Sequence, residues 1–135
     1  MGIIGFNFNK ILAEKSEQVK GKINISNNVN ISSIDKVDMG IKDQTGLKFS
    51  FVFNSTYEPK MGKIAIEGDV VYLGKKDETK KILDEWKKNK KVTPDVMEKI
   101  LNTVLAKCNV EALILSRDIN LPPPLQLPKV AAKKE

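Results

Sequence analysis

Apolar and polar side chains alternate with a period of two through the first half of the chain, the pattern of half-buried β-strands. The clearest run is 47–53, where one face carries a leucine and three phenylalanines. Similar runs cover 6–9, 19–34 and 63–73, and Asn27 and Asn28 are expected to form a turn or bulge inside the second. The segment 57–62 contains Pro59 and Gly62 and has hairpin length. Consecutive strands joined by short loops predict an antiparallel meander.

Helical spacing replaces alternation after residue 75. A first helix is expected over 77–91, capped by Asp77, with an acidic start and a basic end that suit the helix dipole. Thr93 followed by Pro94 is a strong start signal for a second helix, whose wide apolar stripe covers 96–105. A third helix, short and mostly buried, is expected over 110–117.

The sequence LPPPLQLPKV at 121–130 fixes an extended path without internal hydrogen bonds. Its apolar residues can be anchored only by docking on another surface, so we expect the segment to form a terminal strap laid across its own domain. The alternative is that the segment is a ligand for a proline-recognising groove of another protein. The fold class is therefore α+β: an antiparallel four-stranded meander sheet, two to three helices packed on one face and a C-terminal proline-rich strap. One domain should span 1–130, with a disordered tail at 131–135.

The chain has no histidine and a single cysteine, Cys108, expected to be a buried, inert thiol. These facts exclude histidine-activated nucleophiles, zinc fingers, paired redox cysteines and disulfide frameworks. The glycines form no phosphate-binding motif. Two carboxylate pairs, Glu67 with Asp69 and Asp35 with Asp38, leave an oxygen-ligand metal hydrolase as a minor hypothesis. We expect no catalytic residues, no metal site and no cofactor.

The balance of 23 basic to 17 acidic residues gives a net charge of +6, which suggests an anionic partner such as nucleic acid. All but one of the basic residues are lysine, whereas base recognition favours arginine; lysine, isoleucine and asparagine also share A/T-rich codons. A codon bias therefore explains much of the charge. The alternative is an anion-binding surface formed by the lysines that lie in and beside the first helix: Lys75, Lys76, Lys80, Lys81, Lys87, Lys88, Lys90 and Lys91.

Nothing at the start resembles a signal peptide, and no segment approaches the roughly 20 apolar residues of a membrane span. We therefore expect a cytoplasmic protein without membrane insertion. The face of strand 63–73 opposite its main apolar stripe carries Val71 and Leu73, and Val52 adds to the same side. This partly apolar outer surface is either ordinary scatter or a face through which sheets pair in an oligomer.

The segments CNVEALILSRDI (108–119) and LPPPLQLPKV (121–130), with VVYLG (70–74) as a looser match, resemble the SecB family of export chaperones or an archaeal relative of it. In that family a four-stranded antiparallel sheet precedes helices, an arginine–acid pair and a proline-containing connection. This chain departs from the family in its basic charge, its shorter helix before the prolines and its lack of a long final helix.

The SecB resemblance implies a non-enzymatic chaperone that holds unfolded or apolar polypeptide clients and forms a homo-oligomer, a dimer or a tetramer. Such a protein needs exposed apolar surface beside polar rims rather than catalytic groups. Five residues are candidates for that surface, although each could instead belong to the core or to an oligomer interface: Val52, Tyr57, Val71, Leu73 and Trp86.

Overall fold

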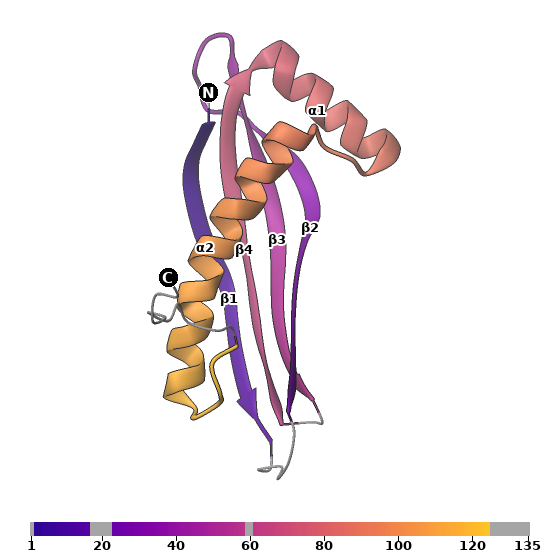
Figure 1. The fold of residues 1–135 in the computed structure, drawn as a ribbon. Coiled ribbons are helices and arrows are strands. Elements are labelled where there is room, and N and C mark those ends of the chain that lie inside the picture. The colour runs from indigo at the N-terminus through magenta and orange to yellow at the C-terminus, as the bar shows by residue number, and fades with distance from the viewer. Residues whose placement is uncertain (1, 17–22, 59–60, 125–135) are drawn as a thin grey trace, which may run out of the picture.

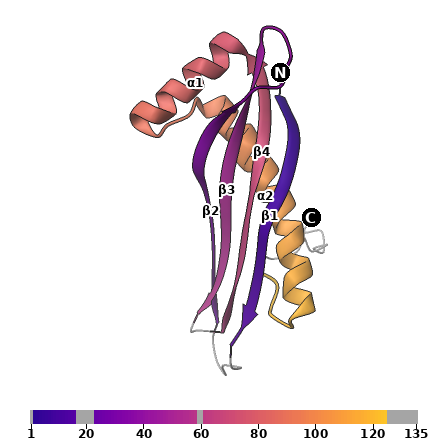
Figure 2. The ribbon, with the colours of Figure 1, turned by 180° about the vertical axis from the view of Figure 1, so that it is seen from behind.

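The computed structural model describes residues 2–16, 23–58 and 61–124. Its strands are β1 (Gly2–Lys15), β2 (Asn24–Val37), β3 (Gln44–Glu58) and β4 (Gly62–Lys75), and its helices are α1 (Lys76–Asn89) and α2 (Pro94–Asp118). The strands form one long antiparallel sheet, and both helices lie on the same face of it (Figure 1, Figure 2). The α+β prediction of a four-stranded antiparallel sheet followed by helices on one face is confirmed.

The strand order is β1-β4-β3-β2. Strands β2, β3 and β4 follow one another as the predicted meander, whereas β1 pairs with β4 along its whole length instead of with β2. This placement puts Phe6 of β1 against Phe51 of β3, with ring centroids 5.3 Å apart, and Phe8 edge-on to Phe6 at 5.1 Å. The phenylalanines of β1 thus pack, partly buried, on the apolar face of β4 and β3, whereas the neighbouring strand β2 of a simple meander is rich in asparagine.

The irregularity in β2 lies between Ile31 and Ser33, not at Asn27 and Asn28 as expected. The two asparagines pair regularly with β3 opposite Ser55 and Asn54. Asn27 lies on the side of β2 that faces the helices, where it is exposed to solvent at the sheet edge and makes two hydrogen bonds. Its carbonyl oxygen accepts from the Ser55 hydroxyl at 2.5 Å, and its amide donates to the Pro124 carbonyl at 2.8 Å. The part of the predicted second strand before residue 23 lies outside the described residues.

The core lies between the sheet and the helices. Alternate side chains of β3 and β4 face it and are almost completely buried, among them Leu47, Phe49, Phe51, Phe53, Tyr57, Ile64, Ile66, Val70 and Tyr72. Gly68 is required where β1 crosses closest to β4, because a Cβ atom there would lie 2.0 Å from the Asn7 carbonyl oxygen and 2.8 Å from the Phe51 ring.

Helix α1 is capped two residues earlier than predicted. Its N-cap is Lys75, which makes no side-chain capping bond, so Asp77 lies in the first turn and not at the cap. The helix ends at Asn89, and the C-cap Lys90 adopts the left-handed conformation and donates its N–H to the Trp86 carbonyl. Thr93 and Pro94 do start α2 as expected.

Helix α2 is continuous over 25 residues, so the prediction of separate helices at 94–105 and 110–117 is wrong. The intervening residues 106–109 contain neither glycine nor proline, and nothing in them ends a helix. The buried positions recur every fourth residue: Val96, Ile100, Val104, Cys108, Ala112 and Ser116. A helix makes a full turn every 3.6 residues, so each buried position lies about 40° further around the helix axis than the one four residues before it. This rotation is expected for a helix packed on a twisted sheet.

The first residues of the proline segment leave α2 and run along the sheet (Figure 1). The Leu121 N–H donates to the Ser116 carbonyl at 2.8 Å, and the Leu121 side chain is buried. The Tyr57 hydroxyl donates to the Pro122 carbonyl at 2.5 Å, and Asn27 binds Pro124. Residues 121–124 therefore tie the end of α2 to β3 and β2, while Leu125, Leu127, Val130 and the tail lie outside the described residues.

Candidate functional site

The five residues predicted to bind peptide do not share one surface. Val52, Val71 and Leu73 lie half-buried on the face of the sheet away from the helices, here called the outer face, whereas Trp86 belongs to α1 on the opposite side. Tyr57 is completely buried. The prediction of Tyr57 as exposed binding surface is wrong, because its strand position faces the helices and its hydroxyl holds the proline segment.

Most of the outer face is polar. Cross-strand ion pairs join Lys10 to Glu67 and Glu14 to Lys63, each at 3.9 Å. Val52 lies in the same row as Lys10 and Glu67, so it is isolated among polar neighbours.

Among the described residues, apolar side chains gather at one end of the outer face. There Val71 and Leu73 lie in neighbouring rows, and Val37 shares the row of Leu73 through Gly46. The Met39 side chain covers Gly46, since a Cβ atom on that glycine would meet the Met39 Cγ at 3.0 Å. We call Val37, Met39, Val71 and Leu73 the outer apolar end.

The carboxylates of Glu67 and Asp69 are already engaged with neighbouring side chains. Glu67 pairs with Lys10, and Asp69 accepts from the amide of Asn9 at 2.9 Å and from that of Asn7 at 3.5 Å. Within 2–16, 23–58 and 61–124, no group of three histidine, cysteine, aspartate or glutamate residues is placed to hold a metal ion. The hydrolase hypothesis therefore gains no support from these residues.

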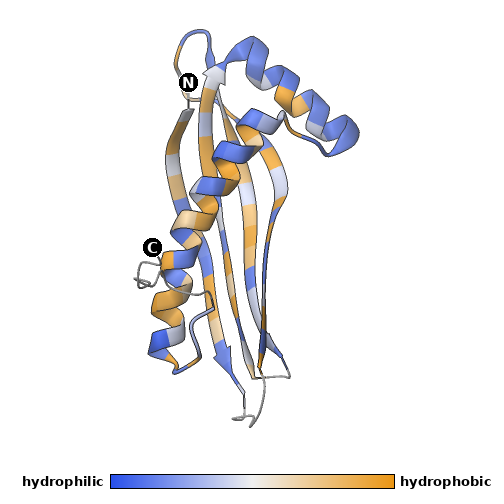
Figure 3. Ribbon diagram, viewed as in Figure 1, coloured by the Kyte–Doolittle hydropathy of each residue, from blue (hydrophilic) through white to orange (hydrophobic). Residues whose placement is uncertain are grey.

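The second half of α2 exposes apolar side chains, although the sequence predicted this segment to be mostly buried. Val110 is 59% exposed and Ile114 is 38% exposed. The colouring of Figure 3 shows apolar residues gathered on this half of α2, in contrast to the hydrophilic α1. Beside them lies a cavity of about 330 Å³ that is lined by Leu113, Ile114, Ser116, Arg117, Leu121 and Pro123.

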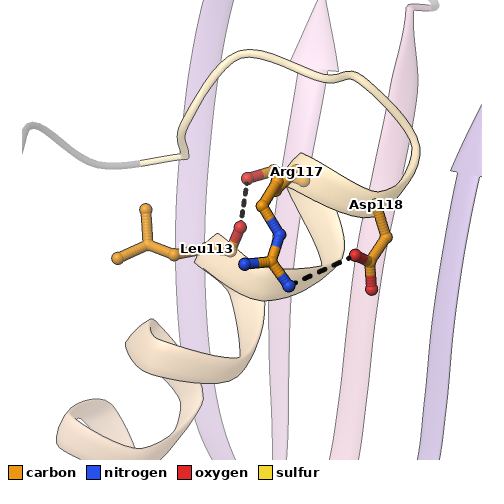
Figure 4. Close-up of polar contacts among 4 residues, drawn as sticks. Leu113, Arg117 and Asp118 are labelled. Atoms are coloured by element: carbon orange, nitrogen blue, oxygen red, sulfur yellow. Dashed lines mark hydrogen bonds and ion pairs between the residues drawn. The ribbon is translucent and has the colours of Figure 1, made fainter.

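We call Val110, Ile114 and this cavity the α2 ledge. Arg117 at its end pairs with Asp118 at 3.5 Å, as the close-up in Figure 4 shows, and both side chains are largely exposed. An ion pair so open to solvent contributes little to stability, which leaves the guanidinium accessible as a polar rim to the ledge. Sequence analysis missed the ledge because it assigned the whole segment to the core.

The eight lysines predicted to form an anion-binding surface do not make one continuous cationic face. One side of α1 alternates lysines with carboxylates around a shallow cavity: Asp77, Lys80, Lys81, Asp84, Glu85 and Lys88. Lys90 lies over the Trp86 ring at 5.3 Å from its centroid. Lys76 and Lys80 are brought together elsewhere, at a second cavity between α1 and the sheet.

The cavity between α1 and the sheet has a volume of about 390 Å³ and is lined by Lys36, Thr45, Leu47, Lys76, Thr79, Lys80 and Leu83. We call it the α1 cavity. Its sheet residues come from β2 and β3, where Lys36 is paired with Leu47 in the ladder and therefore faces the helices. Sequence analysis missed Lys36, although the period of two places it on the same face as the buried Ile34.

Cys108 is buried in α2, as expected. Burial, with a smaller contribution from the negative charge of Glu111, raises the pKa of this thiol from 9.0 to about 12. The reactive thiolate is therefore suppressed near neutral pH. Burial also raises the pKa of Tyr57 from 10.0 to about 12.

No helix in the described parts of the chain has the length and apolarity needed to cross a membrane.

Comparison with known proteins identifies the fold but no sequence relative. No protein-family model matches the sequence, and no curated protein matches it. Among solved structures, the SecB-like chaperone Rv1957 of Mycobacterium tuberculosis, in complex with a ChAD peptide from the Rv1956 HigA1 antitoxin, superposes with a TM-score of 0.52. The match covers 98% of this chain and 91% of that one, at 12% identity. The fold is SecB-like.

The structure has the sheet and the helices on one face that the resemblance implied. Arg117 and Asp118 pair at the end of α2, before the proline segment. At 12% identity the likeness extends to the fold alone.

Proposed function

We propose that this protein is a non-enzymatic, SecB-like chaperone or peptide-binding module that holds unfolded or apolar segments of other polypeptides. The observation that carries the proposal is the SecB-like fold, which covers 98% of the chain. The peptide in complex with the Mycobacterium tuberculosis chaperone supports it, since a chain of the same fold binds a peptide. Fold likeness raises the expectation for a function without deciding it, so the binding surfaces must be argued from the residues.

The α2 ledge is the surface that we propose for apolar clients. Val110 and Ile114 present unpartnered apolar area beside a cavity large enough for one or two side chains, with Arg117 as a polar rim. Burying about 300 Å² of apolar surface there contributes roughly 7 kcal/mol before the cost of ordering the client. Such binding is weak and broad in specificity, as a holding function requires.

The remaining predicted residues keep supporting roles in the proposal. Val71 and Leu73 belong to the outer apolar end, which we propose as the contact between copies in a homo-oligomer, a dimer or a tetramer. Val52 and Trp86 are partly exposed candidates for additional client contact. We place the protein in the cytoplasm, where nascent and unfolded chains are available.

Nucleic acid is the competing ligand class. It would use the lysines of α1, which the structure intersperses with four carboxylates on the same helix. Attraction of phosphates by those lysines is offset by the neighbouring negative charges. We therefore prefer the polypeptide ligand.

The test is a binding titration followed by fluorescence anisotropy. A labelled protein that has been reduced and alkylated, and so stays unfolded, is compared with its native form. We expect micromolar binding of the unfolded form, no binding of the native form and no requirement for ATP. Val110→Ser should weaken binding several-fold, whereas Ile41→Ser, which removes a similarly exposed apolar side chain from the β2–β3 connection, should not. Equal weakening by the two variants would contradict the assignment to α2.

A further inference from the structure

The α1 cavity has a charge composition unlike the rest of α1. Three of its seven lining residues are lysines, Lys36 from β2 and Lys76 and Lys80 from α1, and no carboxylate lines it. Across the described residues, none of these three lysines has a carboxylate within ion-pair distance. Three cations that converge on one cavity from two elements favour an anionic group between them.

A hydroxyl group adds a polar contact to the wall of the cavity. Thr45 lines the cavity, is 6% exposed, and makes no side-chain hydrogen bond to any residue in the described segments. No fully buried side-chain oxygen or nitrogen of these segments lacks a partner, so the Thr45 hydroxyl oxygen is open to the cavity. Thr79, on the opposite wall, differs in that its hydroxyl already donates to the carbonyls of Lys75 and Lys76 at 3.2 and 3.1 Å. The Thr45 hydroxyl is thus a donor available to a bound group.

The floor of the cavity is apolar. Leu47 is fully buried beneath it, and Leu83 closes the side formed by α1. A volume of about 390 Å³ is at the small end of the range for ligand pockets and suits one or two side chains. The combination of an apolar floor, a cationic rim and one hydroxyl donor matches a carboxylate next to an aliphatic side chain.

We infer that the α1 cavity binds an acidic, apolar segment of a client polypeptide, with the carboxylate among Lys36, Lys76 and Lys80 and a neighbouring aliphatic side chain on Leu47 and Leu83. The inference rests on the proposed function, since it names the class of client segment. The N-terminal turns of α1 add a favourable dipole for the carboxylate. Nucleic acid fits less well, because a base would need an aromatic or arginine surface to stack on, and neither lines the cavity.

The experiment uses the full chain and two fluorescein-labelled peptides, one with alternating leucine and glutamate and one with glutamine at every glutamate. At 0.15 M salt, the acidic peptide should bind about tenfold more tightly than the amide peptide. The triple variant Lys36→Gln, Lys76→Gln and Lys80→Gln should remove this preference. The control variant Lys81→Gln, Lys87→Gln and Lys88→Gln makes the same charge change on α1 outside the cavity and should keep it.

Thr45→Val provides a second variant that changes no charge. Valine matches threonine in shape, so the fold is retained. Affinity for the acidic peptide should fall threefold to tenfold, and affinity for the amide peptide should change little. Urea titration of each variant confirms that it is folded.

Several outcomes would overturn the inference. Equal affinity for the two peptides, or equal loss in the cavity and control variants, would refute the cavity as an acid-specific site. Displacement of the acidic peptide by a single-stranded oligonucleotide of matched charge, sensitive to the same three lysines, would assign the cavity to nucleic acid. A parallel titration with the unfolded protein separates the two proposals. If the unfolded protein binds and the peptides do not, only this inference fails; if neither binds, the chaperone proposal fails as well.

Discussion

The hydrogen bond from the Tyr57 hydroxyl to the Pro122 carbonyl links the centre of the sheet to the segment that follows α2. Tyr57→Phe removes this bond and leaves the ring in place. A bond of this kind contributes about 1 kcal/mol net, and the half-exposed Pro122 allows water to reach the freed carbonyl. The expected loss in the free energy of unfolding is therefore about 1 kcal/mol at pH 7.

Urea denaturation followed by circular dichroism measures this loss. With a denaturant slope of about 1.5 kcal/mol/M, the midpoint should fall by roughly 0.7 M with the slope unchanged. A midpoint within 0.1 M of the wild type would refute the reasoning that the hydroxyl anchors the segment.

The same variant predicts a pH dependence of definite sign. Burial raises the pKa of Tyr57 from 10.0 to about 12, so its contribution to stability is complete below pH 10 and is lost as the pH rises from 10 to 12. At pH 11 the wild type should have lost about 1.4 kcal/mol through this residue, and phenylalanine nothing. The difference between the two proteins should therefore vanish between pH 10 and 11, and by pH 11 the wild type should be slightly the less stable of the two. Tyr72→Phe, which removes the bond from Tyr72 to Glu78, serves as the control for the other tyrosine.

Three further predictions concern the core, the sheet and the charged surface. The raised pKa and the burial of Cys108 predict that its thiol reacts with a disulfide reagent only as fast as the protein unfolds; rapid labelling of the native protein would contradict this. Cys108→Ala should also reduce the loss of stability between pH 9 and 12. Gly68→Ala should destabilise the fold by more than about 3 kcal/mol because of the clash with Asn7, whereas Gly2→Ala, with no atom within 4 Å, should leave the thermal midpoint unchanged. Oligonucleotide binding at 0.15 M salt should be weaker than 100 μM, as the carboxylates of α1 offset its lysines; a steeply salt-dependent, tighter complex would contradict this.

The sequence was sufficient for the fold class and for the approximate places of the strands, because these depend on local periodicity. The alternation over 47–53 continues to the end of β3, and the signal at Thr93 and Pro94 marks the true start of α2. The place of β1 beside β4 depends instead on a contact between Phe6 and Phe51, which are far apart in the sequence, and no local pattern records that contact. The continuity of α2 was missed because residues 106–109 carry a weak apolar pattern, although none of them breaks a helix.

The candidate sites were harder to predict than the fold because exposure depends on tertiary packing. Tyr57 and Val110 illustrate this in opposite directions: the tyrosine was expected at the surface and is buried, while the valine was expected in a buried helix and is exposed. The α1 cavity combines side chains from β2, β3 and α1, so no single segment of the sequence shows it. Lys36 was not predicted either, although its position on the helix-facing side of β2 follows from the strand period.

The central claim, that this protein holds unfolded chains without catalysis, is tested most directly by light scattering of an aggregating client. A chemically unfolded enzyme is diluted into buffer with increasing amounts of this protein and no ATP. We expect scattering to fall in proportion to the protein added and to be suppressed almost completely near a stoichiometric ratio, with Val110→Ser requiring several-fold more protein. Unchanged aggregation at a several-fold molar excess would contradict the claim.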